Sequence, residues 1–245
     1  MNPPGSLLVV GGGGGLGRHL VLSLARLGAP VVVADAVIEA AETVAGEAAA
    51  LGLEVLARPV DVTDQASVDR VVAAADALDG LVGVVNAAGI TGRVPFHELD
   101  EQRWTRVVDV NLHGAYRVAA AAIPVLRARG GGVLVNIASA AALRPSPGSV
   151  AYAAAKAGVV ALSRSLAAEV AAHGIRVWAV CPPAIDTGIF QRMLAEAGGD
   201  EHARRIAEEA RRPLGRVVTP EEIAEVVRFL VQGGGPPYAA EPLVV

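Results

Sequence analysis

Tyr152 and Lys156 stand four positions apart, and their side chains could together carry acid–base chemistry. On an α-helix this spacing places a phenol and an ammonium on one face. A phenol with a pKa near ~10 exchanges protons poorly at neutral pH. A unit charge about 4 Å away is worth roughly 4 kcal/mol at an effective dielectric constant of ~20, enough to bring that pKa toward ~7. The pair predicts a general acid/base at Tyr152, although ordinary solvated helix faces also show this spacing.

A glycine-rich turn near the N-terminus predicts a phosphate-binding site. It follows the apolar run Leu7–Val10, which indicates a buried strand, and precedes a helical pattern over residues 18–27. Glycine lets backbone N–H groups approach a pyrophosphate at a helix N-terminus, where the helix dipole favours negative charge. Two phosphate-binding spacings fit, so the sequence leaves open which glycines take part, and a flexible loop is the alternative. The glycines of the two spacings are Gly11, Gly12, Gly14, Gly15 and Gly17.

Asp35 ends the apolar run Val31–Ala34, near the spacing after the glycines that suits an acidic residue bound to a ribose diol. A carboxylate at this place repels a 2′-phosphate. No Arg or Lys occurs between Ala36 and Leu51, so the sequence predicts NAD in preference to NADP, with Arg58 unassigned. The alternative role of Asp35 is that of a turn residue at the end of a strand.

The chain of 245 residues has the length and composition of one α/β domain spanning residues 1–245. Aliphatic strands alternate with Ala-rich helical segments, and no linker or low-complexity tract divides them. This order predicts a Rossmann-type, doubly wound parallel sheet of about seven strands in a three-layer α/β/α arrangement, with ligands at the carboxyl ends of the strands. Strands after the first are expected at Val31–Ala34, Val55–Val60, Leu81–Val85, Val133–Ala138 and Ile175–Val180.

Several classes of function are disfavoured by the composition. The net charge is −4 and the basic residues are dispersed, which argues against a nucleic-acid partner. The longest apolar runs are shorter than the roughly twenty residues of a membrane span, and the N-terminus does not resemble a signal peptide. One cysteine, Cys181, suggests a buried thiol in a reducing, cytoplasmic setting. His97, His113 and His173 lack metal-ligand spacing, so no metal is expected.

The glycine turn, Asp35 and the Tyr152/Lys156 pair together resemble the classical short-chain dehydrogenase/reductase family, and further motifs match in order over nearly the whole chain. Asp61-Val62 is similar to the family's adenine-contacting pair. Residues 86–89 resemble its Asn-Ala-Gly motif, and residues 182–187 resemble the segment that holds the nicotinamide. The cofactor-binding residues that the resemblance implies are Gly11, Gly12, Gly14, Gly15, Leu16, Gly17, Asp35, Asp61, Val62, Asn86, Ala87, Ala88, Gly89, Tyr152, Lys156, Pro182, Ile185 and Thr187.

The resemblance implies an NAD-dependent oxidoreductase that interconverts a secondary alcohol and a ketone. Tyr152 would exchange the hydroxyl proton while hydride moves to or from the nicotinamide ring. Lys156 would bind the nicotinamide ribose and lower the Tyr152 pKa, Ser139 would hold the substrate oxygen, and Asn111 would position a water that connects Lys156 to solvent. Taken singly, Ser139 would more commonly end a strand and Asn111 cap a helix.

Three positions depart from the family pattern. Pro183 replaces a common Gly, which removes a backbone N–H beside the expected nicotinamide site. Val10 replaces a frequent Thr that braces the glycine turn. Glu241 stands where Gly is common, and the tail lacks the usual trailing Asp-Gly-Gly. The family tail often joins a tetramer interface, so we expect a homo-oligomer, with a tetramer favoured over a dimer.

Residues 188–213 are the least family-like segment and predict a charged amphipathic helix that serves as a substrate lid. An apolar pocket for a small secondary alcohol or ketone is expected beneath it. Helical packing against the sheet is the alternative role of each apolar candidate. The expected substrate-contacting residues are Ser139, Ala141, Tyr152, Ile189 and Met193, with Ile90, Val94, Leu143 and Phe190 as further pocket candidates.

A second class of function fits the same fold. Such a protein would keep the dinucleotide as a structural or regulatory ligand, or use it for a non-redox reaction such as dehydration or epimerisation. The complete set of Asn111, Ser139, Tyr152 and Lys156 favours the oxidoreductase, because a binding module has no physical need for a phenol with a tuned pKa.

Overall fold

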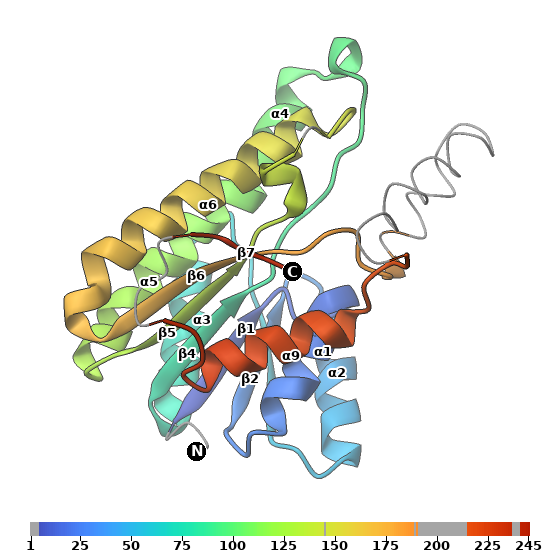
Figure 1. Cartoon of the computed structure of the whole chain (residues 1–245). Helices are drawn as coiled ribbons and strands as arrows, with labels where there is room; N and C mark the ends of the chain where they lie inside the picture. Colours follow the sequence, from blue (N-terminus) through green and yellow to red (C-terminus); the bar gives the residue numbers. More distant parts are fainter. Residues whose placement is uncertain (1–4, 145, 189, 191–214, 237–240) are drawn as a thin grey trace.

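The computed structural model describes residues 5–144, 146–188, 190, 215–236 and 241–245. Their centre is a parallel sheet in the order β3-β2-β1-β4-β5-β6-β7, with helices on both faces (Figure 1). This confirms the predicted doubly wound sheet of seven strands. The strands are β1 (Ser6–Val10), β2 (Val31–Asp35), β3 (Val55–Pro59), β4 (Leu81–Asn86), β5 (Gly132–Ile137), β6 (Ile175–Cys181) and β7 (Leu243–Val244).

The predicted strand positions are confirmed to within one residue at each end, because apolar runs bounded by turn residues mark buried strands clearly. The predicted first helix begins earlier, at Gly15. The α-helices of the described residues are α1 (Gly15–Ala25), α2 (Ile38–Ala50), α3 (Gln65–Asp79), α4 (Glu101–Val108), α5 (Gly114–Ala128), α6 (Val150–Val170) and α9 (Pro220–Val231).

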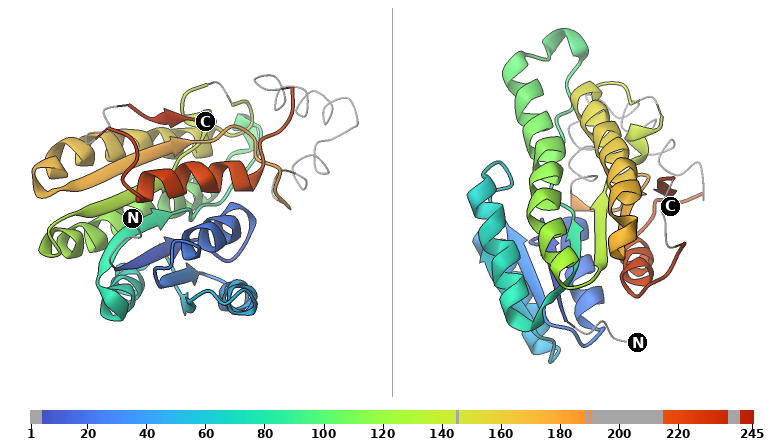
Figure 2. Two further views of the ribbon diagram at one scale, coloured as in Figure 1. Left: turned by 60° about the horizontal axis from the view of Figure 1, so that its bottom comes forward. Right: turned by 90° about the vertical axis from the view of Figure 1, so that its left-hand side faces the viewer.

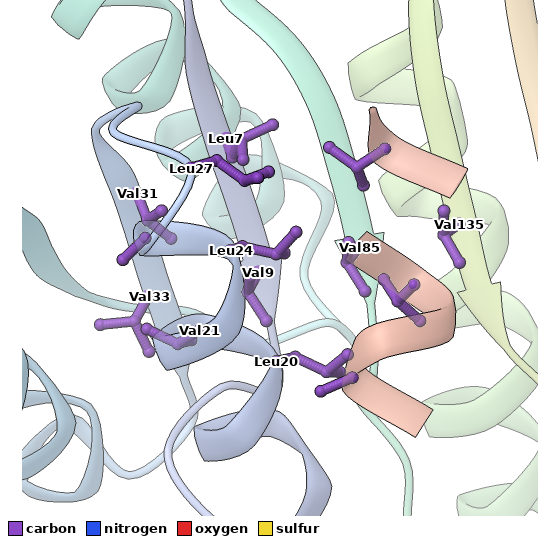
Figure 3. Close-up of a cluster of buried hydrophobic side chains, with 14 of the residues drawn as sticks. Leu7, Val9, Leu20, Val21, Leu24, Leu27, Val31, Val33, Val85 and Val135 are labelled. Atoms are coloured by element: carbon purple, nitrogen blue, oxygen red, sulfur yellow. The ribbon is translucent and has the colours of Figure 1, made fainter. Parts of the chain in front are cut away.

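Alternation of side chains along the strands builds two separate cores. Leu7 and Val9 of β1 point to the face covered by α1, α2 and α9, whereas Leu8 and Val10 point to the face covered by α3, α5 and α6. Figure 2 shows the two helical layers. Figure 3 shows the first core, in which Leu20 and Leu24 of α1 approach the strands. Full burial of each such side chain contributes about 1.5–3 kcal/mol.

The strand order reverses between β1 and β4, and the loops after these two strands touch at this point. Ala87 N donates to Val10 O at 2.8 Å. A Cβ on Gly11 would lie 2.5 Å from Ala88 N, and Gly11 also has a φ of +77°, so only glycine fits. In doubly wound sheets, ligands bind outside the carboxyl ends of the strands at such a reversal.

No helix within the described ranges is both long enough and apolar enough to form a membrane span. Helix α9 packs against α1, and a capping box fixes its start. Thr219 N donates to Glu222 Oε2 at 2.9 Å, while Thr219 Oγ1 accepts from Glu222 N at 3.4 Å. Two of the helix's otherwise unpaired groups are thereby satisfied.

Substitution of this cap tests its contribution. We expect Thr219→Ala to lower the free energy of unfolding by about 1 kcal/mol, because the N–H of Glu222 loses its acceptor. Urea denaturation measures the change. Thr105→Ala, on the exposed side of α4, is the matched control. Equal unfolding midpoints for the two variants would contradict a stabilising cap.

Candidate active site

The glycine turn divides into a packed part and an open part. A Cβ on Gly17 would lie 2.0 Å from Gly11 O, and one on Gly12 would lie 2.6 Å from Val33 Cγ2, so these positions need glycine for packing. In the part of the chain that the structure describes, nothing lies within 4 Å of a Cβ placed on Gly14 or Gly15. Gly14 is also the N-cap of α1 and has no side-chain cap. The open part therefore offers the helix N-terminus to an anion.

Asp35 lies directly beside the glycine turn. Its Oδ2 accepts a hydrogen bond from Gly13 N at 2.8 Å, and its Oδ1 accepts one from Val37 N at 3.1 Å. A Cβ on Gly13 would lie 2.9 Å from the carboxylate, so glycine is needed there too. The structure thus brings together the predicted ribose and phosphate elements. Gly13 was absent from the predicted residues, and its place within the glycine run was the available signal.

Tyr152 and Lys156 lie on one face of α6, as their spacing predicts. The ammonium of Lys156 is 5.7 Å from the centre of the Tyr152 ring. Lys156 is only 4% exposed, and its Nζ donates to Ile137 O at 2.9 Å. The lysine is therefore held against the end of β5, next to the phenol.

Ser139 follows β5 and faces the same phenol. Its Oγ accepts from Ala141 N at 3.1 Å and caps the short 3-10 helix Ala140–Ala142. Burial raises the pKa of Tyr152, and a hydrogen bond with Ser139 offsets part of that rise. The predicted neighbours Ser139, Tyr152 and Lys156 are thus brought together, and Ala141 stands beside Ser139.

Burial dominates the electrostatics of this pair. Desolvation raises the pKa of Tyr152 above its ordinary value, and the Ser139 hydrogen bond offsets only part of the shift. Desolvation also lowers the pKa of Lys156 to about 8. Burial therefore outweighs the predicted lowering of the Tyr152 pKa, and the effect of the Lys156 charge on the phenol stays a prediction. Both side chains are removed from water, which disfavours the charged form of each.

Asn111 lies in η2 (Asp109–His113), a π-helical turn between α4 and α5, and so does not cap a helix. Such turns are frequent at functional sites. Its Nδ2 donates to Ile90 O and Val107 O, both at 2.9 Å, while the buried Oδ1 has no hydrogen-bond partner among the described residues. A Cβ on Gly89 would lie 2.6 Å from that Oδ1 and 3.3 Å from Lys156 Nζ. The predicted pair of Asn111 and Lys156 therefore meets at Gly89.

The predicted adenine-contacting pair lies after β3. The Asp61 carboxylate accepts from Thr63 N and Thr63 Oγ1, and these bonds lower the pKa of Asp61. Val62 is buried, and its carbonyl accepts from Arg117 at 3.1 Å. Arg117 also binds Asp109 of η2 at 2.9 Å. It therefore links the Asp61-Val62 pair to the turn that holds Asn111, a connection that the sequence did not indicate.

The segment after β6 is bonded both to the residues that follow β5 and to the residues that precede α9. Ala140 N donates to Pro182 O at 2.8 Å. Ile185 forms a parallel bridge with Val218, and Thr187 N donates to Ile185 O at 2.8 Å. Pro182, directly before Pro183, is therefore joined to the residue that follows Ser139.

Part of the predicted substrate region lies outside the described residues. This holds for Ile189, Met193 and most of the predicted lid over 188–213, whereas Phe190 is described and buried. Among the described residues, no group of three His, Cys, Asp or Glu side chains is arranged to hold a metal. Three buried residues near the site were not predicted to support it: Asn136, Ser163 and Cys181.

Comparison with known proteins matches this chain and its fold to one family. A family model described as short chain dehydrogenase covers residues 6–198. The 2-(S)-hydroxypropyl-CoM dehydrogenase 3 of Xanthobacter autotrophicus is 36% identical over 92% of this chain and 88% of its own length. The cis-4-hydroxycyclohexanecarboxylate dehydrogenase of Sinomonas cyclohexanicum is 38% identical over 91% of this chain and 87% of its own length. A solved actinorhodin polyketide ketoreductase variant with NADPH is 30% identical, with a TM-score of 0.90, and the match covers 100% of this chain and 97% of that one.

The buried ammonium predicts a pH-dependent stability. Because the pKa of Lys156 falls from 10.5 to about 8 on folding, the unfolded chain binds more protons between these values. The unfolding free energy of the wild type should therefore rise across this window relative to Lys156→Met. Urea denaturation of both proteins at about pH 7 and about pH 10 measures the difference. If the unfolding free energies of the wild type and Lys156→Met differ by the same amount at both pH values, the lowered pKa of Lys156 is contradicted.

Proposed function

Because this chain belongs to the short-chain dehydrogenase/reductase family, we propose that it interconverts a secondary alcohol and a ketone, with NAD(H) as its cofactor. One arrangement carries the proposal. Gly11 of the glycine turn touches the loop after β4, and Gly89 of that loop lies against both Asn111 and Lys156. The dinucleotide-binding turn and the acid–base residues therefore share one edge of the sheet.

The residues of this edge fit a nicotinamide dinucleotide. The open N-terminus of α1 at Gly14 and Gly15 suits a pyrophosphate, and Asp35 beside it suits a ribose diol. The same carboxylate disfavours a 2′-phosphate, which supports NAD over NADP. Ile185 and Thr187 lie in the segment that follows β6, and we propose that they contact the nicotinamide.

When bound, the nicotinamide supplies or accepts the hydride. The phenol oxygen of Tyr152 exchanges the proton of the substrate hydroxyl. Ser139, already hydrogen-bonded with Tyr152, holds the substrate oxygen as negative charge develops there. Lys156 places a positive charge next to the phenol. The unpartnered Oδ1 of Asn111 provides an acceptor near Lys156, which suits a water on the path of the proton.

Proton exchange at Tyr152 depends on the local charge, because burial alone raises the pKa of the phenol. A charged Lys156 favours phenolate, and its own pKa of about 8 keeps it mostly protonated at neutral pH. We infer that turnover in the oxidative direction requires Lys156 in its charged form.

The substrate class follows from the apolar pocket candidates in the sequence, among them Ile90, Val94 and Leu143. We propose a small, mainly apolar secondary alcohol, and the cyclic alcohol named for the Sinomonas relative makes cyclohexanols the first compounds to test. The homotetramer, the cytoplasmic location and the lid over 188–213 stay predictions, and sedimentation of the purified chain tests the first of them.

Removal of the phenol hydroxyl tests the proton-transfer role. We expect Tyr152→Phe to lower kcat by about 10²-fold or more, since positioned acid–base catalysis typically contributes that much. Absorbance of reduced nicotinamide, with a panel of cyclic and linear secondary alcohols and their ketones, measures turnover. Tyr116→Phe, at an exposed phenol on α5, is the control and should keep full activity. Full turnover by Tyr152→Phe would overturn the assignment.

Removal of the Asp35 charge tests the cofactor preference. We expect Asp35→Asn to raise the ratio of NADP to NAD efficiency by about tenfold, equivalent to ~1.4 kcal/mol of lost repulsion. The amide keeps an oxygen for the bond from Gly13 N, so the charge is the main change. Asp79→Asn, at the exposed end of α3, is the matched control. An unchanged ratio in Asp35→Asn would remove the basis for NAD.

A further inference from the structure

A connected group of buried polar side chains lies beneath the candidate site. Its members are Asn86 on β4, Asn136 on β5 and Ser163 on α6, which are 4%, 0% and 1% exposed. Polar groups in a sheet core are costly unless they are hydrogen-bonded to one another. Their presence among the aliphatic side chains of the second core therefore calls for a physical reason.

The hydrogen bonds of the three side chains form a continuous chain. Ser163 Oγ donates to Val159 O at 2.8 Å and accepts from Asn136 Nδ2 at 3.0 Å. Asn86 Nδ2 donates to Asn136 Oδ1 over a longer distance of 3.4 Å, and Asn86 Oδ1 accepts from Ala88 N at 3.2 Å. The chain thus connects helix α6 to the loop that contacts the glycine turn.

The same chain fixes α6 along β5. Ser163 stands seven residues, or about two helical turns, after Lys156 and therefore on the same helix face. Lys156 binds the carbonyl of Ile137, the neighbour of Asn136. Two polar contacts two turns apart thus hold the helix to consecutive residues of one strand, and that strand leads to Ser139.

Apolar packing alone would define this position weakly. The buried face of α6 consists mainly of small side chains, among them Ala151, Ala155 and Val159. Burial of such a face is favourable but non-directional, so it changes little when the helix slides or rotates slightly. Hydrogen bonds lose their strength over a few tenths of an ångström and degrees of angle. They therefore supply the directional part of the contact.

We propose that Asn136 and Ser163 are positioning residues for the reaction. They set the place of Tyr152 and Lys156 relative to Ser139, and through Asn86 they align this helix with the loop after β4. Neither residue touches the reacting atoms. The inference rests on the oxidoreductase function proposed above for its kinetic consequence, but its structural consequence is independent of that function.

Two substitutions at one position separate hydrogen bonding from packing. Ser163→Ala removes the acceptor of the Asn136 amide, whereas Ser163→Cys keeps the volume and leaves only a weak acceptor. We expect both variants to lower kcat by about tenfold to a hundredfold, with the KM for NAD changed less than about twofold, because a small displacement of catalytic groups has effects of this size. Ser165→Ala, exposed on the same helix, should match the wild type.

Either of two kinetic results would overturn the proposal. The first is a kcat equal to that of the wild type in both Ser163 variants. The second is a loss confined to Ser163→Ala, which would assign the effect to packing. The volume-preserving variant keeps the test valid if Ser163→Ala does not fold.

Hydrogen exchange provides a readout that does not require turnover. In both Ser163 variants, we expect amides over residues 152–158 to exchange at least about tenfold faster, with a smaller change in α1. Equal acceleration in α1 and α6 would mean a merely global loss of stability and would reject positioning. If the wild type turns over none of the alcohols or ketones, the proposed function fails, and the exchange result still decides the role of Asn136 and Ser163.

Discussion

The close contact between the loops after β1 and β4 is the constraint on which the site depends. Gly11 fits against Ala88 only because it has no side chain and adopts a positive φ. This contact brings the glycine turn to the loop that ends at Gly89, and Gly89 in turn admits Asn111 and Lys156 to one place. A side chain at either glycine would separate the glycine turn from Asn111 and Lys156.

Burial gives this site its electrostatic character. Lys156 and Tyr152 are both removed from water, so each charged form is disfavoured, and the pKa shifts of the two groups run in opposite directions. The pKa of a phenol in such a place responds strongly to nearby charge, because screening by water is reduced. A site of this kind is sensitive to the charge of Lys156, and its acid–base behaviour is set by a few fixed neighbours.

Helix α6, which carries the proposed acid–base pair, is held to β5 by two polar contacts. Lys156 Nζ donates to Ile137 O. Two turns later, Ser163 Oγ accepts from Asn136 Nδ2. An aliphatic core supplies most of the stability of the fold, whereas these few directional contacts determine where the side chains of the site lie.

The sequence by itself determined the features that depend on local periodicity and turn chemistry. Apolar runs located the strands, the four-residue spacing placed Tyr152 beside Lys156, and the glycine run marked the turn that Asp35 joins. Only the tertiary structure decided the raised pKa of Tyr152 and the pairing of Asn136 with Ser163, which are 27 residues apart. Desolvation and hydrogen-bond partners arise from segments distant in the chain, and no local pattern encodes which of those segments will meet.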